Sequence, residues 1–134
     1  MMKIPDPIKL DTARFLAGEI RSEDFRHDAH VAIAAALLVD KPFLEAAQAY
    51  ANVISHMATA AGRPEAFNLT ITLAFLSVIA ERLHDAPEDD LDAFLAANPD
   101  LLDKRYLKHW YADDRLRSPT ARTIFLLPEP SLAS

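Results

Sequence analysis

Residues 29–39, AHVAIAAALLV, contain no acidic residue, lysine or arginine, and they indicate a helix that is apolar on every side. Residues 66–80, AFNLTITLAFLSVIA, form a second charge-free stretch. Because a helix without a polar face is buried by its neighbours, both stretches are expected inside a group of helices. The first is rich in alanine, whose small side chain lets helices approach closely, and it is expected to be the central helix. The sequence therefore predicts an all-α fold, a compact bundle of about four main helices with shorter C-terminal helices.

Glycine and turn signals support the same fold class over the whole chain. The 134 residues include only two glycines, and no Asn-Gly or Asp-Gly hairpin turn occurs. We predict a single helical domain over residues 1–134, with extended tails at residues 1–10 and 126–134. The expected helices cover residues 11–17, 22–39, 42–61, 63–84, 90–97, 101–111 and 119–125.

Charge and cysteine content exclude several functions. The net charge of −6, with dispersed lysines and arginines, argues against nucleic-acid binding. The absence of cysteine rules out disulfides, a thiolate zinc site and a cysteine nucleophile. The charge-free stretches are shorter than the roughly 18 to 20 residues that span a bilayer, and the N-terminus lacks the pattern of a secretory signal. We therefore expect a cytoplasmic protein that does not bind membranes.

Four polar residues near the start of the apolar stretches are the candidates for a site: His27, His30, Asn68 and Thr72. Buried polar groups must be hydrogen-bonded within the protein or face a cavity. His27 and His30 are three residues apart and share a helix face. If the helices that carry the two pairs pack together, the four side chains converge near one end of the bundle.

The histidine pair is open to three interpretations. Histidine titrates near neutral pH, so His27 and His30 could act as general acid and base. Two imidazoles at this spacing could also bind a metal ion. Alternatively, both rings are structural and bond to backbone carbonyls or to Asp24 and Asp28.

The remaining candidates are also ambiguous. Asn68 could orient a carbonyl or carboxylate of a ligand, or it could belong to the structure of a helix end. Thr72 could contact the ligand or bond to the backbone carbonyl of Asn68. Tyr111 carries a phenol that could donate a hydrogen bond into a pocket.

Several of these residues lie in motifs that resemble those of a family of small uncharacterised bacterial helical proteins. The resemblance covers residues 25–128 and is carried by Phe25-x-His27-x-x-His30, Phe67-Asn68-x-Thr70-x-Thr72, Leu101-Leu102-Asp103, Trp110-Tyr111 and Ser118-x-x-Ala121-Arg122. No activity is established for the family. The resemblance implies that His27, His30, Thr72, Tyr111 and Ser118 occupy recurrent positions. A third histidine is expected where this chain has Asn68, which argues against a three-histidine metal site.

The leading hypothesis is a small-molecule site inside the bundle. His27 and His30 would be its acid/base or hydrogen-bonding groups, and Asn68, Thr72 and Tyr111 would hold the polar end of the ligand. No metal or other cofactor is predicted. An enzyme of this kind would be a lyase, isomerase or hydrolase that needs no redox cofactor.

Two alternatives remain open on the sequence alone. One is a helical protein-interaction module in which the histidines are structural. The other is a bundle that binds a divalent metal through the histidines with Asp24 or Asp28. The sequence does not decide whether the chain is an enzyme or whether it forms a homodimer.

Overall fold

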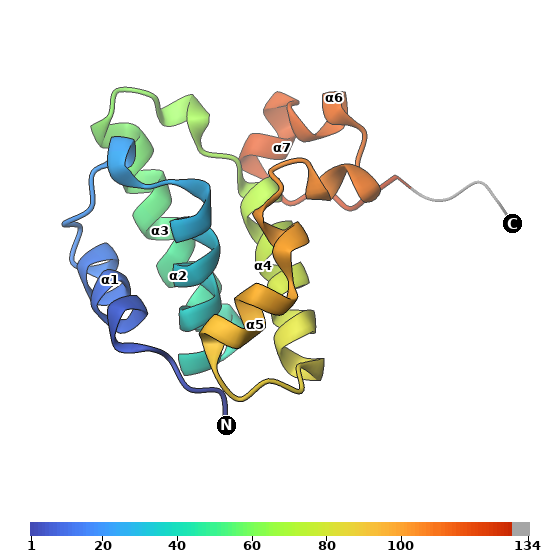
Figure 1. Cartoon of the computed structure of the whole chain (residues 1–134). Helices are drawn as coiled ribbons and strands as arrows, with labels where there is room; N and C mark the ends of the chain where they lie inside the picture. The colour runs from blue at the N-terminus through green and yellow to red at the C-terminus, as the bar shows by residue number, and fades with distance from the viewer. Residues whose placement is uncertain (130–134) are drawn as a thin grey trace, which may run out of the picture.

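The computed structural model describes residues 1–129, which form an all-α fold without a strand (Figure 1). Four longer helices come first: α1 (Asp6–Leu16), α2 (His27–Asp40), α3 (Phe43–Ala60) and α4 (Leu69–Asp85). Three short helices follow: α5 (Leu91–Ala97), α6 (Asp113–Leu116) and α7 (Pro119–Thr123). The predicted all-α fold class is confirmed. Within residues 1–129, every helix is too short or too polar to cross a membrane.

Helix α2 lies at the centre of the bundle, as its composition predicts. It packs against α1, α3 and α4 (Figure 1). Its buried residues are Val31, Ile33, Ala34, Ala35, Ala36 and Leu37. The three consecutive alanines present buried side chains in three directions around the helix, which is why helices can cover α2 on several sides.

The predicted N-terminal tail is wrong, because α1 begins at Asp6 rather than at Asp11. Pro5 precedes the helix and Pro7 lies in its first turn. Proline is tolerated there because the first N–H groups of a helix have no partner within the helix. The predicted stop is confirmed, since Gly18 follows the helix with a φ of 73°.

Two longer predicted helices are interrupted near their starts. Residues 22–39 divide into a 3₁₀ turn, Ser22–Asp24, and α2, so that His27 is the first residue of α2. Residues 63–84 likewise divide into a 3₁₀ turn, Pro64–Ala66, and α4. Each interruption places predicted site residues at the amino end of a helix rather than along its side.

The C-terminal part matches the prediction at some elements only. The helices predicted over residues 90–97 and 119–125 are present as α5 and α7, and the side chains of Asp90 and Ser118 cap them. The helix predicted over residues 101–111 is wrong, because 3₁₀ turns at Pro99–Leu102 and Tyr106–His109 take its place. Helix α6 was not predicted. Residues 126–129 of the predicted tail lie outside the helices, and residues 130–134 lie outside the described part of the chain.

An aromatic cluster joins α1 to the centre of the bundle. The Phe15 ring is fully buried, with its centroid 5.3 Å from that of Phe25 and 5.4 Å from that of Tyr50. Phe15 therefore connects α1, the segment before α2, and α3.

We predict that Phe15→Ala lowers the free energy of unfolding by about 3–5 kcal/mol, because it leaves a cavity between three elements. Leu44→Ala is the control, since Leu44 is 81% exposed and its truncation is expected to change stability by no more than about 0.5 kcal/mol. Urea denaturation measures the free energy of unfolding of both variants. Equal losses of this free energy in the two variants would contradict the central role of Phe15 in the core.

Candidate functional site

A cavity of about 400 Å³ lies between α2, α3 and α4. Four of the five predicted site residues line it: His27, His30, Asn68 and Thr72. Its wall is mainly apolar, and it includes Val31, Ala34, Ile54, Met57, Phe75 and Ile79. Concave, largely apolar sites with a few polar groups are typical of small-ligand binding.

The two histidines are close together, but they are half-buried rather than buried as predicted. His27 is the first residue of α2 and His30 lies one turn further on. Their ring centroids are 6.2 Å apart. Each ring bonds to a different part of the chain, so the two residues have different chemistry.

His30 has a protein partner at both ring nitrogens. Its Nε2 lies 3.1 Å from the carbonyl oxygen of Phe25, and its Nδ1 lies 3.2 Å from the hydroxyl of Tyr50. A carbonyl can only accept, so Nε2 carries the hydrogen, and Nδ1 accepts from the Tyr50 hydroxyl. The ring also stacks on Phe25, with centroids 3.7 Å apart. His30 therefore has no free nitrogen for a ligand.

Burial also keeps both members of the His30–Tyr50 hydrogen bond in their neutral forms. It lowers the pKa of His30 to about 4, which keeps the imidazole neutral at physiological pH. Burial also raises the pKa of Tyr50, which keeps the phenol protonated as a donor. The hydrogen-bonded pair is thus uncharged, as a partly buried polar contact requires.

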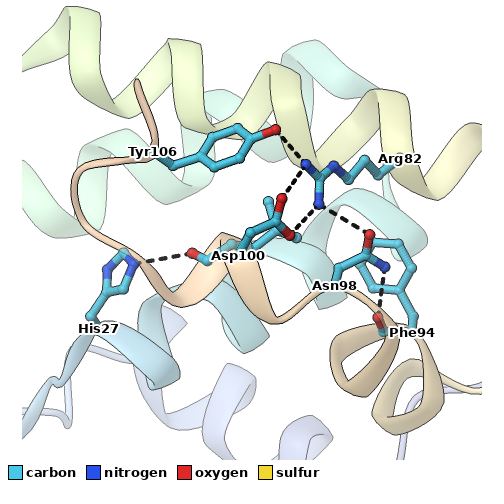
Figure 2. Close-up of polar contacts among 7 residues, drawn as sticks. His27, Arg82, Phe94, Asn98, Asp100 and Tyr106 are labelled. Atoms are coloured by element: carbon cyan, nitrogen blue, oxygen red, sulfur yellow. Dashed lines mark hydrogen bonds and ion pairs between the residues drawn. The ribbon is translucent and has the colours of Figure 1, made fainter. Parts of the chain in front are cut away.

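His27 is the histidine with a free acceptor. Its Nε2 lies 3.2 Å from the carbonyl oxygen of Leu101, to which it donates (Figure 2). Its Nδ1 has no hydrogen-bond partner within residues 1–129. Burial is the largest influence on this ring, and it lowers the pKa of His27. The edge of the ring meets Phe75, with centroids 5.5 Å apart and planes at 90°. A neutral imidazole with an open Nδ1 can accept a hydrogen bond or a proton.

The carbonyl that orients His27 is itself held in place by α4. Leu101 belongs to the 3₁₀ turn Pro99–Leu102, and Asp100 in that turn accepts two hydrogen bonds from Arg82, at 2.6 and 2.7 Å. Arg82 also bonds to Asn98 and Tyr106 (Figure 2). The turn is therefore fixed to α4 through Arg82 and to α2 through His27.

Sequence analysis did not identify Arg82 and Asp100 as partners. They are 18 residues apart, with α5 between them, and no motif links them. Their ion pair lowers the pKa of Asp100 through the hydrogen bonds from the guanidinium. Only the packing of the turn against α4 reveals their role in orienting His27.

Asn68 and Thr72 bond mainly to the protein. The Asn68 Oδ1 accepts from the Ile71 N–H at 2.9 Å and caps α4, while its Nδ2 donates to the Leu116 carbonyl at 2.7 Å. The Thr72 hydroxyl donates to the Asn68 carbonyl at 2.7 Å. These contacts correspond to the structural alternatives that the sequence left open. The Thr72 oxygen retains its ability to accept a hydrogen bond.

Tyr111 does not line the cavity. Its hydroxyl donates to the Leu126 carbonyl at 2.7 Å. The fully buried Thr70 holds the same segment: it donates to the Ile124 carbonyl at 2.7 Å and accepts from the Leu126 N–H at 3.0 Å. Thr70 was quoted in the sequence motif but not assigned a role. Thr70 therefore attaches the segment after α7 to α4, and Tyr111 attaches it to the connection before α6.

The residues that could bind a metal ion are dispersed in the described part of the chain. Residues 1–129 contain no group of three or more histidine, cysteine, aspartate or glutamate side chains placed to hold an ion. The Nε2 atoms of His27 and His30 both point to backbone carbonyls. The pair therefore does not present two free nitrogens to one ion.

No protein-family model matches this chain, and no significant match was found among curated proteins or solved structures. The resemblance drawn from the sequence motifs stays a prediction.

We predict that acid destabilises the protein through His30. Its pKa is about 4 when folded and near 6.5 when unfolded, so the unfolded chain binds more protons between these values. Neutral His30 makes its full contribution to the free energy of unfolding above pH 6.5. As the pH falls from 6.5 towards 4, the free energy of unfolding decreases by up to about 1.4 kcal/mol per pH unit. Urea denaturation at several pH values measures this slope, and His30→Gln should reduce it. A ring-proton NMR titration that places the His30 pKa near 6.5 would refute the prediction.

Proposed function

We propose that this protein binds a small, largely apolar molecule in the cavity between α2, α3 and α4. The observation that carries the proposal is the cavity of about 400 Å³ with its mainly apolar wall. This pocket opens to the surface near Ser22, Ala61 and Ala66, which are exposed. A concave, mainly apolar pocket with a few polar groups in its wall is typical of small-ligand sites.

The polar groups of the wall set limits on the ligand. His30 and Asn68 bond to the protein through both of their polar atoms. The free Nδ1 of His27 and the Thr72 hydroxyl oxygen remain as acceptors. A ligand hydroxyl or amine could donate to either, while the rest of the molecule contacts Val31, Ile54 and Phe75.

Ligand binding is testable with the neutral fluorescent probe N-phenyl-1-naphthylamine. We expect saturable binding with one probe molecule per chain. Ala58→Phe, which places a larger side chain at the cavity wall on α3, should weaken binding at least about tenfold, since a loss of about 1.4 kcal/mol in contacts suffices.

Ala13→Phe is the matched control, because Ala13 is exposed on α1 and does not line the cavity. Thermal unfolding of each variant shows that it is folded. Binding that is absent in the wild type, or equal in the two variants, would overturn the proposal.

The free nitrogen of His27 favours a second candidate function, acid/base catalysis on the bound molecule. A neutral imidazole with an open Nδ1 is suited to accept a proton from a substrate. His27 would then be the base, and His30 would support the site without exchanging protons. Such chemistry fits a lyase, isomerase or hydrolase that needs no redox cofactor.

The different availability of the two histidines is testable by labelling with diethyl pyrocarbonate, which modifies unprotonated imidazole nitrogens. We expect mass spectrometry of peptides to show faster modification of His27 than of His30, because both His30 nitrogens have protein partners. Exposed His56 serves as the internal reference. Modification of His30 at the rate of His27 would contradict the assigned roles.

A further inference from the structure

Among residues 1–129, Arg63 is the only lysine, arginine, aspartate or glutamate that lines the cavity. It lies in the connection between α3 and α4, directly after Gly62, whose φ of 74° ends α3. Its own N–H donates to the Ala58 carbonyl at 2.9 Å, which fixes the backbone beside the cavity. The side chain is exposed, so it lies at the rim of the cavity rather than inside it.

The guanidinium of Arg63 is also available for a ligand. No ion pair within residues 1–129 includes it. The acidic side chains of the neighbouring Ser22–Asp24 turn, Glu23 and Asp24, both pair with Arg21. Glu65, two residues further along, lies beyond ion-pair distance. An unpaired cation beside an apolar cavity is notable in a chain whose net charge is −6.

We propose that the ligand is an amphipathic carboxylic acid, with its apolar body in the cavity and its carboxylate bound to Arg63 at the rim. This inference rests on the proposed function and specifies its ligand class. A guanidinium presents paired N–H donors that match the two oxygens of a carboxylate. One arginine supplies one positive charge, which matches a carboxylate better than a doubly charged phosphate. Within residues 1–129, no aspartate or glutamate lines the cavity, so no carboxylate of the wall faces the ligand anion directly.

The test compares decanoate with 1-decanol, which have ten-carbon chains of equal length and differ in charge. Each competes with N-phenyl-1-naphthylamine for the wild type, Arg63→Gln and Arg14→Gln. Arg14 is the matched control, because it is exposed on α1, lies outside the cavity and has no ion pair within residues 1–129. Both substitutions remove one positive charge from the whole chain.

We expect Arg63→Gln to weaken decanoate binding about three- to tenfold, the range for a partly exposed charge-assisted contact, and to leave 1-decanol binding unchanged. Arg14→Gln should change neither affinity by more than about twofold. If the probe and 1-decanol bind but Arg63→Gln affects decanoate no more than Arg14→Gln does, the ligand class is wrong and the proposed function stands. If the probe does not bind, the proposed function fails, and this inference fails with it.

Discussion

The close approach of three helices to α2 is the constraint on which the rest of the structure depends. The central residues Ala34, Ala35 and Ala36 are each at most 3% exposed, although they belong to one helix and point in different directions. Small side chains permit this approach but fill little volume. Alanines also occur in the cavity wall, at positions 34, 58, 61 and 66. The composition that lets the bundle close therefore also leaves space between α2, α3 and α4.

The start of α2 places two histidines with different hydrogen-bond partners in the wall of this space. His30 is held neutral between the Phe25 carbonyl and the Tyr50 hydroxyl, and it joins the segment before α2 to α3. His27 donates to the Leu101 carbonyl and keeps its Nδ1 open. Two histidines of similar position on one helix thus differ in role because of their partners. Both ring nitrogens of His30 bond within the protein, and His27 keeps one nitrogen open.

Sequence patterns predicted the parts of the fold that local physics determines. The apolar stretches, the glycines Gly18 and Gly62, and the N-cap Ser118 all have effects within a few residues. The start of α1 was predicted wrongly, because proline is tolerated in the first turn of a helix. The turns in residues 101–111 were predicted wrongly, because packing against α4 determines their structure. Four predicted residues do line one cavity.

Their exact roles depend on contacts that span long separations. His27 bonds to a carbonyl 74 residues away, and Asn68 to one 48 residues away. No spacing rule within the sequence reveals such partners. The alternative of a protein-interaction module also stays a prediction, since exposed apolar residues such as Leu44 and Leu127 do not by themselves specify a partner.

A crystal structure determined under xenon pressure tests the central claim most directly, because xenon enters apolar cavities without needing any polar contact. The account predicts a xenon site between α2, α3 and α4, bounded by residues such as Ala34, Phe75 and Ile79. Side chains that fill this region, with no xenon bound there, would contradict the existence of the cavity and hence the account of function built on it.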